Sequence, residues 1–185
     1  MLLGGIRHYF NGAAKQMERM QENLDLIKSQ AEGWEIAQEQ RYTDAHFYFI
    51  CWHAIHREIE LFREIIPLAA PRNTLRNYRE QLEHYSTARD HLEHKRDRLR
   101  GKKNKKGEPL AQPGHLGYIT ADTLHYGGDH FDISATSLNM LEQIVEALFA
   151  EVMTEAENRA SQVNSVLQAS LEGLGYRDET GRKAE

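Results

Sequence analysis

The sequence lacks several features that define other classes of protein. Its single cysteine, Cys51, excludes an internal disulfide and favours a reducing compartment. An uncharged apolar run of about eighteen residues, the length that spans a bilayer, is missing. The N-terminal segment turns polar at Arg7, too early for a secretory signal. We therefore expect a cytoplasmic protein that is neither cross-linked by internal disulfides nor inserted in a membrane.

The formal net charge of −5 argues against a generally basic nucleic-acid binder, but the charge is unevenly distributed. From Arg89 to Lys106, nine basic residues stand against three acidic ones, which makes this segment +6 and leaves −11 elsewhere. Such a segment attracts a polyanion, although cations near a helix C-terminus also complement the helix dipole. The candidate RNA-binding residues are Lys95, Arg96, Arg98, Arg100, Lys102, Lys103, Lys105 and Lys106.

Apolar residues recur three or four positions apart in four segments. They predict helices over 12–31, 43–66, 71–101 and from Ser134 or Ser137 to 171. Residues 117–133 hold β-forming residues bounded by glycine pairs, which predicts a short hairpin.

These elements together predict an all-α, up-and-down bundle of about four main helices, with a small loop or hairpin insertion near 101–133. The bundle forms a single domain over 1–176. We expect the charged tail, 177–185, to be disordered.

Arg89, Asp90 and His94 lie on the third predicted helix. Arginine holds a phosphodiester through a planar cationic fork, and histidine transfers protons near neutral pH. The spacing resembles the Arg-x4-6-His motif of HEPN domains, all-helical bundles in which a polar residue, here Asp90, commonly follows the arginine.

The resemblance implies a homodimer in which the motifs of two protomers face each other across a cleft. One His94 would act as general base on a ribose 2′-hydroxyl and a second as general acid on the departing 5′-oxygen. Arg89 would stabilise the phosphorane, and Asp90 would orient a neighbouring side chain. We therefore expect a metal-independent endoribonuclease that needs no cofactor, with Arg89, Asp90 and His94 as catalytic residues.

Two alternatives to this enzyme remain open. In the first, the protein is a non-catalytic helical module that binds a nucleotide, an RNA or a protein partner, and the motif is a surface charge network. The second is a metal-binding bundle, because ten histidines are an excess for this length. Adjacent helices would bring together His53, His56, His84 and His91, although no Glu-x-x-His pair of the ferritin-like kind occurs. Otherwise His53 and His56 are partly buried, hydrogen-bonded residues.

The second predicted helix is rich in aromatic residues. Phe47, Tyr48, Phe49 and Trp52 occupy more than one of its faces, so the helix is either central or meets a partner protomer. Cys51 lies within this apolar run, which predicts a thiol with a raised pKa and a structural role.

Overall fold

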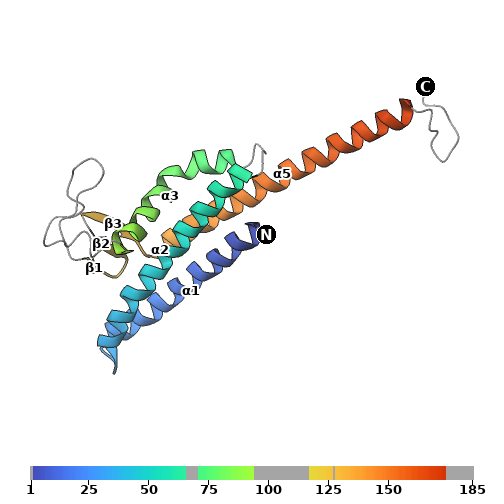
Figure 1. Ribbon diagram of the computed structural model, residues 1–185. Coiled ribbons are helices and arrows are strands. Elements are labelled where there is room, and N and C mark those ends of the chain that lie inside the picture. The colour runs from blue at the N-terminus through green and yellow to red at the C-terminus, as the bar shows by residue number, and fades with distance from the viewer. Residues whose placement is uncertain (1, 66–70, 94–116, 127, 174–185) are drawn as a thin grey trace, which may run out of the picture.

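The computed structural model describes residues 2–65, 71–93, 117–126 and 128–173. These residues form four helices, which pack against one another in an up-and-down order (Figure 1). The prediction of an all-α bundle with a small insertion is confirmed. The helices are α1 (Leu2–Ser29), α2 (Trp34–Ile65), α3 (Arg72–Glu93) and α5 (Ala135–Gly173), and the strands are β1 (Tyr118–Ile119), β2 (Thr123–Tyr126) and β3 (Asp129–Asp132).

The first two helices begin earlier than predicted. α1 starts at Leu2 because its apolar stripe continues upstream through Ile6, which is fully buried. α2 starts directly after the turn at Gly33, whose φ of +87° suits glycine. The sequence pattern missed the first part of α2 because Arg41 and Asp44 are buried polar residues that interrupt the apolar period.

The last two helices match their predicted positions. α5 begins after Ser134, whose hydroxyl accepts a hydrogen bond from the backbone N–H of Thr136 at 3.1 Å, as at a helix N-cap. α3 begins beside Pro71, as predicted, and is described as far as Glu93. The predicted continuation of α3 to residue 101 and the tail 177–185 lie outside the described residues.

The hydrophobic core is built around α2, which is therefore the central helix. Tyr48, Phe49 and Trp52 are fully buried. The Trp52 ring stacks on Tyr85 of α3 with 4.0 Å between ring centroids. Only Phe47 of the aromatic run is substantially exposed, at 49%. Most of these aromatic residues thus serve the core of one chain.

The small sheet is an antiparallel meander in the order β1-β2-β3. Tyr126 pairs with Asp129 in the hairpin, where Gly128 has a φ of +93°. The predicted hairpin is confirmed, and β1 adds a third strand. Buried Arg41 of α2 donates hydrogen bonds to the carbonyl groups of Thr120 and Ala121, which fastens the sheet to the bundle.

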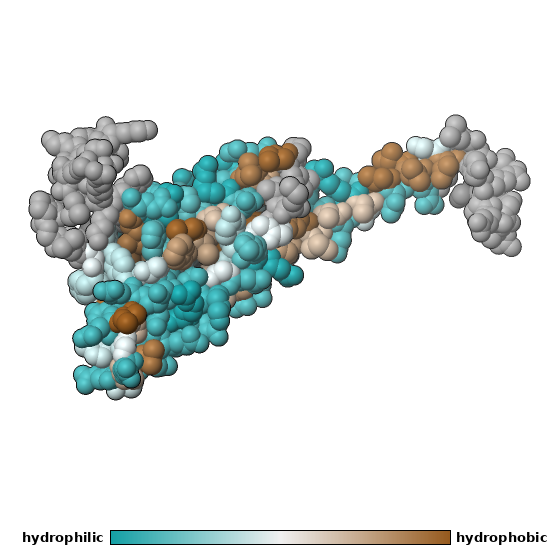
Figure 2. Space-filling view, turned by 60° about the horizontal axis from the view of Figure 1, so that its bottom comes forward, coloured by the Kyte–Doolittle hydropathy of each residue, from teal (hydrophilic) through white to brown (hydrophobic). Residues whose placement is uncertain are grey.

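α5 continues well past the rest of the bundle (Figure 1). Val152 is still 9% exposed, whereas the following apolar side chains are 41% to 67% exposed. Figure 2 shows apolar residues gathered along this projecting end. The exposed apolar residues of the α5 end are Met153, Val163, Val166, Leu167 and Leu171.

Two expectations from composition can be compared with the fold. Cys51 is half-buried, and burial raises the pKa of its thiol to about 11, which agrees with the predicted raised pKa. Among the described residues, no helix combines the length and apolar character needed to cross a membrane.

Candidate functional site

Arg89 lies near the described end of α3 with its side chain 27% exposed. Its Nη1 donates to Asp90 Oδ1 at 2.9 Å, and its Nη2 forms an ion pair with Glu93. These charge-assisted contacts fix the orientation of the guanidinium group. The motif predicts a role for Asp90 but not for Glu93, although Glu93 follows Arg89 at the i, i+4 spacing of a helical ion pair. We call Arg89, Asp90 and Glu93 the Arg89 cluster.

Two histidines of α2, His46 and His53, lie within electrostatic range of the Arg89 cluster. Burial is the main cause that lowers the pKa of both His46 and His53, and the charges of Arg89 and Glu93 act on both rings. Opposite charges partly cancel there, so burial decides the direction. Both histidines are therefore held in their neutral form near pH 7, in which a ring nitrogen can accept a proton.

Each of these two rings has a nitrogen without a hydrogen-bond partner among the described residues. These atoms, Nε2 of His46 and Nδ1 of His53, are buried. Such atoms are uncommon in native interiors, and each calls for an explanation such as a functional role, an ordered water or an ion. His46 is not among the predicted site residues. It stands seven residues before His53, a spacing that places both on one helix face.

His56 lies on the same helix, and both of its ring nitrogens have a polar neighbour. Its Nδ1 lies 2.9 Å from the hydroxyl oxygen of Ser86 on α3, and its Nε2 lies 3.8 Å from Glu60. Burial lowers the pKa of His56 as well. The prediction of a partly buried, hydrogen-bonded histidine is thus confirmed for His56, while His53 keeps an unpartnered nitrogen among the described residues.

The histidine set proposed for metal binding does not converge in the described part of the chain. Within that part, no three or more His, Cys, Asp or Glu side chains form a group that could hold a metal ion. His84 instead turns to the sheet, where its Nε2 lies 3.2 Å from the carbonyl oxygen of His130 and its ring contacts Phe131. The His91 side chain lies outside the described residues.

The remaining predicted site residues also lie outside the described residues. His94 follows Glu93 directly in the sequence, one position beyond the described end of α3. The candidate RNA-binding residues Lys95, Arg96, Arg98, Arg100, Lys102, Lys103, Lys105 and Lys106 are likewise not described. Of the predicted catalytic trio, the structure brings Arg89 and Asp90 into contact.

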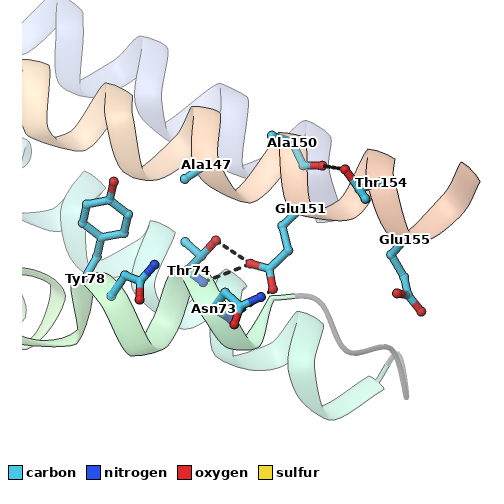
Figure 3. Close-up of a pocket in the computed structure, with 9 residues that line it drawn as sticks. Asn73, Thr74, Tyr78, Ala147, Ala150, Glu151, Thr154 and Glu155 are labelled. Carbon is cyan, nitrogen blue, oxygen red and sulfur yellow. Dashed lines mark hydrogen bonds between the residues drawn. The ribbon is translucent and has the colours of Figure 1, made fainter. Parts of the chain in front are cut away.

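A hollow of about 440 Å³ between α3 and α5 is a weaker candidate (Figure 3). Glu151 dominates it, because its carboxylate accepts hydrogen bonds from the backbone N–H groups of Asn73 and Thr74 and from the Thr74 hydroxyl. The acceptors of Glu151 are thus occupied by the first turn of α3, where the helix dipole also favours a carboxylate. These contacts give Glu151 a structural role, in which it anchors the start of α3 to α5.

Comparisons with known proteins give no relative for this chain. No protein-family model, no curated protein and no solved structure matches it. The function therefore has to be argued from the residues and the geometry of the site.

Proposed function

We propose that this protein is a HEPN-like, metal-independent endoribonuclease with Arg89, Asp90 and His94 as its catalytic residues. The observation that carries the proposal is the guanidinium group of Arg89, which two carboxylates orient on α3, with two partly buried histidines of α2 within range of its charge. Cleavage by a 2′-hydroxyl needs these two elements: a base that takes a proton and a fixed cation that stabilises the phosphorane.

The proposed reaction is an internal transesterification. A histidine base removes the proton of the 2′-hydroxyl, and the 2′-oxygen then forms a bond to phosphorus. The bond from phosphorus to the 5′-oxygen breaks, and a protonated histidine supplies the proton to that oxygen. The products are a 2′,3′-cyclic phosphate and a 5′-hydroxyl end. DNA is not a substrate because it lacks the 2′-hydroxyl.

The histidines have separate roles in this proposal. His94 of each protomer supplies the acid and the base across the dimer cleft, as the resemblance implies. His53 of the same protomer adds an imidazole that burial keeps neutral, within electrostatic range of Arg89, Asp90 and Glu93. Asp90 and Glu93 hold the guanidinium group in place.

The proposal is tested by incubating the purified full chain with a mixed single-stranded RNA pool in EDTA. We expect cleavage by the wild type and loss of cleavage in Arg89→Ala and in His94→Ala. Lys15→Ala is the matched control, because Lys15 is likewise a helix cation paired with a nearby glutamate, Glu18, but lies on α1. Equal activity of all four proteins, or no activity of the wild type, would overturn the proposal.

A homodimer belongs to the same proposal, and the α5 end supports it. An exposed apolar stripe on a lone helix is stabilised when it pairs with a second helix. In an antiparallel pair of two α5 ends centred on Val163, Val166 lies opposite Ala160, so a large side chain meets a small one. Light scattering should give a dimer for the wild type and a monomer for Val163→Glu with Leu167→Glu.

The second candidate function is a non-catalytic module that binds a protein partner. Two observations favour it: Arg89 is already occupied by two carboxylates, and the α5 end presents an exposed apolar face. This alternative predicts no RNA cleavage and a monomeric chain whose α5 end becomes protected from hydrogen exchange when the partner is added.

A further inference from the structure

A second cationic site lies along the same two helices, toward the beginning of α3. A hollow of about 390 Å³ opens there between the end of α2 and the first half of α3. Two glutamates, Glu60 and Glu83, and four arginines line it. We call the four arginines the arginine pocket: Arg63 from α2, and Arg72, Arg76 and Arg79 from α3.

Three of the four arginines have no carboxylate partner in the described part of the chain. Both glutamates are already paired, Glu60 with Arg57 at 2.5 Å and Glu83 with Arg79 at 2.7 Å. Arg63 and Arg72 have no ion-pair partner in the described part of the chain. Arg76 donates to the neutral side-chain oxygen of Asn73 at 3.1 Å.

Three exposed guanidinium groups, those of Arg63, Arg72 and Arg76, are thus left to bind an anion. Arginine binds phosphate through two parallel hydrogen bonds, so several arginines around one hollow favour a phosphate-bearing ligand. The first turn of α3 is not needed for this binding, because Glu151 already accepts hydrogen bonds from the N–H groups of Asn73 and Thr74.

The arginine pocket and the Arg89 cluster are linked by α3. Arg79 and Arg89 both follow the bend at Tyr78, and their ten-residue separation corresponds to about 15 Å along a helix. Arg76 and Arg72 extend the series further from Arg89. A single strand that lies along the α2–α3 face with its reacting bond at Arg89 therefore brings neighbouring phosphates to the pocket.

We propose that the arginine pocket binds backbone phosphates of single-stranded RNA several nucleotides away from the scissile bond. The inference rests on the proposed function, which places the scissile bond at Arg89. It adds a second binding region to the basic segment that follows α3. Affinity then depends on the length of the RNA, because a dinucleotide at Arg89 is too short to reach the pocket.

The test measures binding of the full chain to 2′-O-methyl RNA, which the proposed mechanism cannot cleave. Fluorescence anisotropy compares an oligonucleotide of about 10 nucleotides with a dinucleotide over a range of salt concentrations. The variant is Arg72→Ala with Arg76→Ala. The control is Lys15→Ala with Lys28→Ala, which removes the same charge from exposed positions of α1.

We expect the pocket variant to lose affinity for the longer RNA only. Two lost phosphate contacts make the slope of log K against log salt shallower by about 1.4, which is roughly 25-fold at 0.1 M salt. Equal losses in variant and control, an equal loss for the dinucleotide, or no RNA binding by the wild type would each overturn the inference. Failure of the proposed function is seen separately, as absence of cleavage of unmodified RNA by the wild type.

Discussion

α3 carries two arginine sites in opposite electrostatic settings. In the Arg89 cluster one arginine faces two carboxylates, which gives a formal charge of −1. In the hollow near the start of α3 four arginines face two glutamates, which gives +2. A guanidinium group held by carboxylates is suited to one defined position in a transition state, whereas free, exposed guanidinium groups are suited to attracting phosphates. The difference predicts that the two sites affect different kinetic constants.

The largest expected effect separates these two roles. Arg89→Ala should lower kcat by about 10²–10³-fold with little change in KM, since Arg89 is proposed to act on the developing charge. Arg72→Ala should instead raise KM several-fold and leave kcat nearly unchanged. Steady-state kinetics on one defined RNA measures both constants. A change confined to KM in both variants would remove the distinction between the sites.

Glu151 of α5 anchors the start of α3, next to the arginine pocket. Glu151→Gln removes the charge that caps the first turn of α3, and should lower the free energy of unfolding by about 1–3 kcal/mol. Arg72 and Arg76 sit on that turn and the next, so RNA affinity should fall while kcat is kept. Denaturant unfolding and binding titrations measure these effects.

Glu155→Gln is the matched control, because Glu155 lies one turn further along α5 and pairs with Arg159 of the same helix instead of with α3. We expect it to cost less than about 1 kcal/mol. If the two variants were equally stable, the anchoring role of Glu151 would be wrong.

The histidines opposite the Arg89 cluster make stability depend on pH. Folding lowers the pKa of His46 and His53 below their ordinary value of 6.5, so the unfolded chain binds more protons as the pH falls. Their contribution is fully present above pH 6.5 and is lost as the pH falls through the folded pKa values. Melting temperatures measured from pH 7.5 to 5 should therefore decrease.

Replacing both histidines isolates their share of this pH dependence. His46→Gln with His53→Gln should make the decrease in melting temperature between pH 7.5 and 5 shallower. His56 also has a lowered pKa and remains in this variant, so part of the slope should persist. An unchanged slope would show that the two rings are not buried as neutral groups.

The smallest expected effect tests whether the carboxylates restrain Arg89. Glu93→Gln leaves Arg89 with one anionic partner, Asp90, and raises the local charge from −1 to neutral. RNA affinity should rise by a few-fold, since the guanidinium group gains a free donor. Binding of 2′-O-methyl RNA measures this effect, and a fall in affinity would contradict it.

The sequence predicts the bundle well because its apolar residues keep one helical period over long segments. It fails at the start of α2, where two buried polar residues find partners elsewhere in the chain. Arg41 donates to the carbonyl groups of Thr120 and Ala121, and Asp44 binds Asn23 and Arg19. Such contacts are tertiary, and no local pattern encodes them.

The candidate site is readable from the sequence only where its residues share a helix. Arg89, Asp90 and Glu93 lie within five positions of one another, and Arg72, Arg76 and Arg79 follow a spacing of four and three. The opposition of His46 and His53 to Arg89, and of Arg63 to Arg72, depends on the register between α2 and α3. That register is set by core contacts such as Trp52 on Tyr85, which the sequence does not specify pairwise.

The central claim is that the Arg89 cluster supports cleavage of RNA by its own 2′-hydroxyl, and the ends of the products test it most directly. The wild-type chain is incubated in EDTA with a single-stranded RNA and with the same strand carrying 2′-deoxyribose at the cleaved position. Attack by the 2′-hydroxyl predicts 2′,3′-cyclic phosphate and 5′-hydroxyl ends from the RNA, and no cleavage at the 2′-deoxy position. Intact RNA, or cleavage that persists at the 2′-deoxy position, would contradict it.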